Sequence, residues 1–155
     1  MANISHLLYL SSLGASLLWF GSAFNFFVVQ RAQAAKLLVP KSQRGSPIYP
    51  TLVEALPFLG GMNGAFALLC SLLIGIEYNS YQLFDAPGER FVILVTLSSA
   101  HFSQFAGNVP ILLNGERKGD TYWPVLSGQM LMIFMMDLAQ CLLAAVAAAA
   151  QAGKT

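Results

Sequence analysis

Residues 7–29 read LLYLSSLGASLLWFGSAFNFFVV, a run of apolar and small side chains that contains no charged residue. A helix needs about 20 such residues to cross the roughly 30 Å of hydrocarbon in a bilayer, because every backbone polar group must find its partner inside the same helix. We therefore interpret this segment as a transmembrane helix. It is too long for the apolar core of a secretory signal peptide, and no Lys or Arg precedes it.

Three further segments of similar length and apolarity follow, at about 51–76, 90–113 and 125–148. The segments between them carry most of the charges and most of the prolines. Because 56% of the chain is hydrophobic and only 10% is charged, its composition does not suit a solvated surface. The sequence predicts an all-α integral membrane protein, an antiparallel bundle of four transmembrane helices that forms a single membrane domain over residues 1–155.

The basic residues are distributed unevenly between the connections. The connections 30–50 and 114–124 hold six of the eight Lys and Arg residues, and the others are Arg90 and Lys154. By the positive-inside rule, these two connections face the cytoplasm (or a matrix or stroma) and both termini lie on the opposite side. The formal net charge of +1 offers no basic excess for a phosphate backbone, so nucleic acid is not a predicted partner.

Polar side chains occur at helical spacing in the last two apolar segments. They are Ser98, His101, Gln104 and Asn108 in the third segment, and Gln129, Asp137 and Gln140 in the fourth. Each set falls on one helical face, and the short connection between the segments predicts antiparallel neighbours. Counting outward from residue 119 places Asp137 level with His101, Gln129 near Asn108 and Gln140 near Ser98.

Ionisable residues at membrane depth are costly, and each is therefore a candidate functional residue. A carboxylate at Asp137 would orient the His101 imidazole and make it a better base, so both are candidate catalytic residues for proton transfer. The same side chains could instead only join the two helices by hydrogen bonds of about 0.6 kcal/mol each. The residues form a poor set for a metal and no nucleotide motif occurs, so neither a metal nor another cofactor is predicted.

The second apolar segment carries Asn63 among Gly60, Gly61 and Gly64. The spacing of Gly60 and Gly64 predicts a face on which two helix backbones approach closely, and a gap that accommodates a ligand is the alternative. Glu54 near the start of this segment is explained by the helix dipole or by interface exposure, with a catalytic role as the alternative. Cys70 and Cys141 fall at comparable depth, and we expect two free, buried thiols.

The pattern resembles small four-span families of the DoxX-like and Erg28-like kind. The resemblance rests on a glycine-containing second helix, here FLGGMNGAFALL, and on a third helix with a polar run at mid-membrane, here SSAHFSQFAGN. It covers about half of the chain. Such families include accessory and scaffolding membrane proteins, so the resemblance implies a role in binding partners, and no functional residue is carried over from it.

Three functions are compatible with these features. The first is an accessory or scaffold subunit of a membrane complex, whose partners would be membrane lipids and other membrane-protein subunits or further copies of the chain. The second is an intramembrane enzyme that acts through His101 and Asp137 on a lipid-like substrate such as a sterol, isoprenoid, quinone or acyl chain. The third is a small carrier that works as an oligomer.

Overall fold

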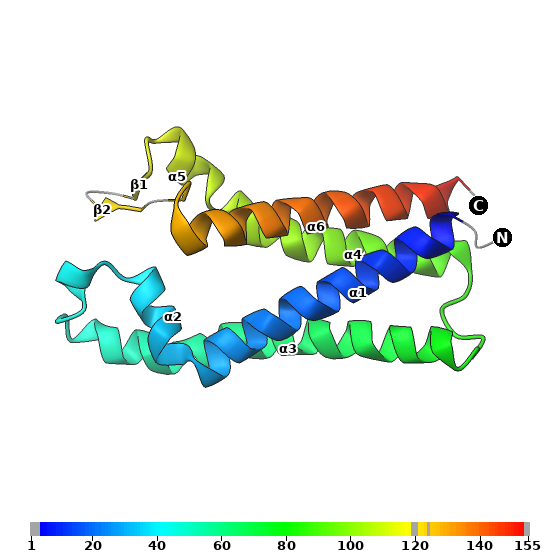
Figure 1. The fold of residues 1–155 in the computed structure, drawn as a ribbon, viewed down its shortest axis with the longest axis horizontal. Helices are drawn as coiled ribbons and strands as arrows, with labels where there is room; N and C mark the ends of the chain where they lie inside the picture. Colours follow the sequence, from blue (N-terminus) through cyan, green and yellow to red (C-terminus); the bar gives the residue numbers. More distant parts are fainter. Residues whose placement is uncertain (1–3, 119–120, 124, 154–155) are drawn as a thin grey trace. The chain divides into compact units, whose positions relative to one another are not determined.

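The computed structural model describes residues 4–118, 121–123 and 125–153. Within these residues the regular structure is helical, apart from one pair of short β-strands (Figure 1). The helices are α1 (Ile4–Phe24), α2 (Arg31–Leu38), α3 (Ile48–Tyr78), α4 (Pro87–Ala106), α5 (Val109–Leu113) and α6 (Gly128–Ala152). A π-helical turn, η1 (Asn25–Val29), continues α1, and a 3-10 turn, η2 (Lys41–Gln43), follows α2. Strands β1 (Arg117–Lys118) and β2 (Thr121–Tyr122) pair antiparallel, with Arg117 opposite Tyr122.

Among the described residues, three helices are long and apolar enough to cross a membrane: Ile4–Val29, Ile48–Tyr78 and Gly128–Ala152. They coincide within a few residues with the predicted segments 7–29, 51–76 and 125–148, so the helical character of these segments is confirmed. The chain divides into two compact units, Met1–Ser12 with Gln82–Thr155, and Leu13–Tyr81. The single domain expected over residues 1–155 stays a prediction.

The unit that contains Gln82–Thr155 is organised around α4 and α6, which lie side by side along their lengths (Figure 1). Helix α4 begins at Pro87, whose missing amide costs nothing in the first helical turn. Glu89 also accepts a hydrogen bond from the backbone amide of Ala86, at 3.3 Å, and so stabilises this end of the helix. Helix α6 begins after Ser127, and Gly128 adopts a φ of +53° that suits glycine.

The predicted third span, 90–113, is not one continuous helix. Helix α4 ends at Ala106, a turn follows at Gly107 and Asn108, and α5 is a separate helix. Pro110 explains the break, because a proline cannot donate the hydrogen bond that the carbonyl of Ala106 would accept in an uninterrupted helix. Helix α4 is also absent from the helices that qualify as spans by length and hydropathy within the described residues.

The unit Leu13–Tyr81 packs η1 and α2 against α3. Ala34 and Ala35 of α2 and Leu56 of α3 form its buried apolar cluster. Helix α2 ends at Leu38 because Pro40 follows, and the residue before proline, Val39, is extended with φ −122° and ψ 122°. Within the same unit, the rings of Phe20 and Phe66 stack with their centroids 5.1 Å apart.

Candidate functional site

His101 on α4 and Asp137 on α6 form a buried pair between these two helices. Nδ1 of His101 lies 3.0 Å from Oδ1 of Asp137, and both side chains are 0% exposed. An ionised carboxylate can only accept hydrogen bonds, so Nδ1–H donates when Asp137 is ionised. The carboxylate then holds the ring in the tautomer in which the other nitrogen, Nε2, is basic. The pair thus combines a proton acceptor with a group that orients it.

The helical register explains why these two residues meet. Leu94, Leu97 and His101 are the buried residues of α4, at spacings of three and four, so they occupy one face of the helix. Asp137 is likewise buried on α6, and other buried residues of this helix are Met130, Ala144, Ala147 and Gln151. Because α4 and α6 pack along their lengths, His101 and Asp137 lie at the same height along the helix pair, although they are 36 residues apart in the sequence.

A second polar contact joins the same helices one turn away from the pair. The hydroxyl of Ser98 donates a hydrogen bond to the carbonyl oxygen of Cys141 at 3.0 Å, and its Oγ lies 3.5 Å from the Cys141 sulfur. Gln140, which we expected near Ser98, is buried in α6 and immediately precedes Cys141 in the sequence. The partner of Ser98 is therefore Cys141, the residue that follows Gln140.

The other predicted polar residues of this hairpin are less enclosed. Gln104 is half-buried on α4. Asn108 lies in the turn between α4 and α5, and Gln129 is exposed in the first turn of α6. Between these two described side chains the structure records no hydrogen bond. The expected proximity of Asn108 and Gln129 stays a prediction, and α4 ends at Ala106, before it reaches Asn108.

The predicted residues of α3 belong to the other unit, Leu13–Tyr81. Asn63 is buried, and its side-chain amide donates to the carbonyl of Leu59 at 2.8 Å, which satisfies the group within its own helix. The Glu54 carboxylate lies 3.3 Å from Arg31 and so links α3 to α2. Cys70 and Cys141 are both free, with Cys70 buried and Cys141 only partly so.

The three predicted packing glycines of α3 differ in their surroundings. A Cβ built on Gly60 would lie 2.4 Å from Cγ2 of Val28, and one on Gly64 would lie 2.7 Å from Cδ2 of Phe24. A Cβ on Gly61 would meet nothing within 4 Å. Gly60 and Gly64 therefore admit the end of α1 and η1 close to the α3 backbone, whereas Gly61 faces outward.

A polar network that the sequence pattern did not predict surrounds Arg90, a residue expected only as a charge at the end of a connection. Nη2 of Arg90 donates to Oδ1 of Asp85 at 2.6 Å, and Nη1 lies 3.4 Å from Nδ1 of His6. The guanidinium carbon of Arg90 also lies 4.9 Å from the ring centroid of Tyr9. The Arg90 side chain is largely buried in this network, with 12% of its surface exposed. The spacing of His6 and Tyr9 on one face of α1 was the available signal, but nothing in the sequence connects that face to Arg90.

Within the described residues, no three His, Cys, Asp or Glu side chains come close enough together to hold a metal ion. The arrangement at His101 and Asp137 is suited to holding or moving one proton, or to joining two helices. Comparison with protein-family models, with curated proteins and with solved structures found no match, so the four-span resemblance stays a prediction based on residues alone.

Proposed function

We propose that this chain is a four-span membrane protein that serves as an accessory or scaffold subunit of a membrane complex. The observation that carries the membrane assignment is the distribution of polarity. Polar side chains such as His101, Asp137 and Asn63 are buried, whereas large apolar side chains such as Phe58 and Leu18 are exposed. In lipid this arrangement is favourable, because the surrounding solvent is apolar and buried polar groups can bond to one another.

Helix α4 fits the role of the fourth span despite its lower hydropathy. Its 20 residues extend about 30 Å, which is enough to cross the hydrocarbon. The polar residue that lowers its hydropathy most at mid-helix, His101, is turned toward α6, while Phe91, Val95 and Phe102 are exposed. From Phe91 to Ala106 the exposed side chains are therefore uncharged, and the exposed hydroxyls of Thr96 and Ser103 are bonded to carbonyls of their own helix.

The first test is the membrane topology of the tagged full chain. If α4 crosses, the number of crossings is even, and tags on the two termini should be accessible from the same, non-cytoplasmic side, with the basic connection 30–50 on the other. Protease protection in sealed vesicles measures this directly. Tags on opposite sides would show that only the three helices with span-like hydropathy cross, and recovery in the soluble fraction would overturn the membrane assignment.

The accessory role is supported by the enclosure of the polar groups. His101 is held by Asp137, Ser98 is bonded to Cys141, and neither His101 nor Asp137 has exposed surface. What the described helices present outward is mainly apolar side chains, which suit lipid or a second helical protein. The competing enzyme hypothesis is favoured by one observation, the 3.0 Å contact that orients the imidazole for proton transfer.

Gentle detergent extraction followed by mass spectrometry of bound proteins and lipids separates these two functions. We expect a protein partner in fixed stoichiometry, retained equally by the wild type and by the conservative variant Asp137→Asn. That variant keeps the size of the side chain and one acceptor oxygen for His101, but it replaces the other oxygen with an amide donor and removes the charge. Isolation of the chain with one lipid-like molecule, whose retention or conversion fails in Asp137→Asn, would instead identify the enzyme.

A further inference from the structure

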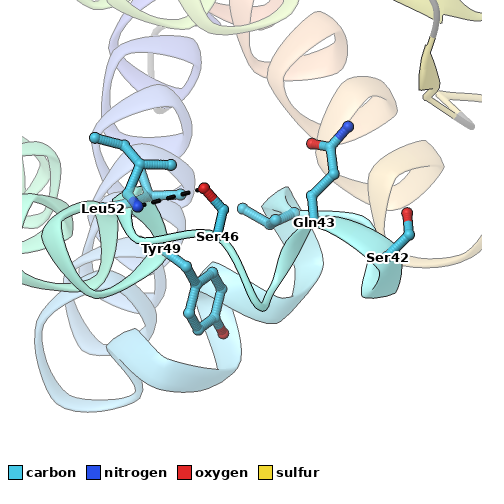
Figure 2. Close-up of a pocket in the computed structure, with 7 residues that line it drawn as sticks. Ser42, Gln43, Ser46, Tyr49 and Leu52 are labelled. Atoms are coloured by element: carbon cyan, nitrogen blue, oxygen red, sulfur yellow. Dashed lines mark hydrogen bonds between the residues drawn. The ribbon is translucent and has the colours of Figure 1, made fainter.

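A hollow of about 450 Å³ lies at the beginning of α3, outside the His101 site (Figure 2). It is bounded by η2, the connection after it and the first two turns of α3. Its lining combines the polar side chains of Ser42, Gln43 and Ser46 with the apolar side chains of Val39, Ile48 and Leu52 and the ring of Tyr49. This size is in the range of small-molecule sites, and the mixed lining offers both polar and apolar contacts to a ligand.

The chain around the hollow is cationic. Residues 30–53 contain Arg31, Lys36, Lys41 and Arg44 and no Asp or Glu. Of these four, only Arg31 has a carboxylate within ion-pair distance among the described residues, namely Glu54 at 3.3 Å. Lys36 and Lys41 are exposed, and Lys41 begins the same η2 turn that supplies Ser42 and Gln43. Lys36, Lys41 and Arg44 thus have no carboxylate within ion-pair distance among the described residues, and Lys41 and Arg44 flank the lining residues Ser42 and Gln43 in sequence.

Arg44 follows the lining residue Gln43 in sequence, and two main-chain carbonyls hold its side chain, one of them from the lining residue Val39. Its Nε donates to the carbonyl oxygen of Val39 at 2.9 Å, and its Nη2 donates to the carbonyl oxygen of Lys36 at 2.6 Å. These bonds occupy two of the five N–H donors of a guanidinium and restrict its orientation. A guanidinium with its remaining donors in fixed positions is well suited to a phosphate group.

We propose that this hollow binds one anionic glycerophospholipid. The phosphate would be bound by Arg44, Lys41 and the hydroxyl of Ser42, and the first part of an acyl chain would lie on Val39, Ile48 and Leu52. The position supports this ligand, because the first turns of a membrane-crossing helix lie at headgroup level, where Tyr49 is also suited. The inference rests on the proposed function only in requiring that α3 crosses the membrane.

The test is native mass spectrometry of the detergent-purified full chain, titrated with phosphatidylglycerol or with phosphatidylcholine of the same acyl chains. We expect one retained phosphatidylglycerol and a clear preference over phosphatidylcholine. Lys41→Gln should lower the apparent affinity for phosphatidylglycerol about fivefold, since one basic residue near an anionic surface contributes about that factor. Ser42→Phe should abolish retention by filling the hollow from its open side, with folding checked by circular dichroism.

The matched control is Arg117→Gln, which removes the same charge from the other basic connection and should leave the affinity unchanged. An equal loss in Arg117→Gln, equal retention of phosphatidylcholine, or unaltered binding in Lys41→Gln and Ser42→Phe would overturn the proposal. Displacement of the lipid by inorganic phosphate at equal concentration would identify a free-anion site instead. Unselective binding by a chain with the expected topology would refute this inference alone, whereas loss of membrane insertion would refute the proposed function.

Discussion

Asp137→Leu is expected to lower the free energy of unfolding by about 3 kcal/mol, the cost of removing one partner from a fully buried polar pair. In the wild type, Oδ1 of Asp137 lies 3.0 Å from Nδ1 of His101, and neither side chain is exposed. The substitution leaves Nδ1 facing an apolar side chain with no water to replace the lost bond. Thermal or denaturant unfolding of the purified protein in detergent measures the loss.

The double variant His101→Leu/Asp137→Leu should recover most of that stability, because it removes both members of the buried pair and replaces them with apolar side chains of similar volume. A double-mutant cycle would then give a coupling energy of at least about 2 kcal/mol, because the double variant loses less stability than the two single variants together. Ser99→Leu, an exposed position on the same helix, is the control and should change the stability by less than about 0.5 kcal/mol. Strictly additive losses at His101 and Asp137 would mean that the contact contributes nothing of its own.

The stable double variant also bears on function. If it still associates with the protein partner expected above, the pair serves to join α4 and α6. If it folds and inserts normally but loses conversion of a lipid-like substrate, the pair serves proton transfer. Stability and function are thus separated in a single protein, which a destabilised single variant does not allow.

Gly60→Ala should destabilise the protein by about 2 kcal/mol, because the added methyl group has no space and overpacking typically has a cost of this size. Its Cβ would lie 2.4 Å from Cγ2 of Val28 and 3.2 Å from the Val28 backbone nitrogen. Valine is branched at Cβ and has little rotamer freedom in a helix, so the clash is relieved only by moving η1 away from α3. Unfolding in detergent again measures the effect.

The neighbouring glycines provide matched controls for this prediction. Gly61→Ala should be neutral or stabilising by up to about 1 kcal/mol, since its Cβ meets nothing within 4 Å and alanine favours helix. Gly64→Ala should fall between the two, because the clashing atom belongs to the ring of Phe24, which is partly exposed and can rotate. Val28→Ala should rescue Gly60→Ala. Equal effects at all three glycines would show that helix propensity, rather than this contact, determines the outcome.

Much of the helical organisation could be predicted from composition and periodicity. Long apolar runs identify α1, α3 and α6, because a segment of that length and polarity has few other stable environments. The polar face of α4 could also be predicted, since spacings of three and four place residues on one side of a helix. Counting along the hairpin placed His101 and Asp137 at the same depth, because both helices rise by the same distance per residue.

Depth along a helix is a property of the sequence, but the direction that a side chain faces depends on how each helix is rotated against its neighbour. Only the tertiary structure therefore decided that His101 and Asp137 touch, that Ser98 bonds to Cys141 rather than Gln140, and that Gly61 faces outward while Gly60 and Gly64 do not. It also decided the network of Arg90 with His6, residues 84 apart, because contacts of such separation leave no local pattern. The sequence by itself determined the apolar helices and their polar faces, while packing determined which of those faces meet.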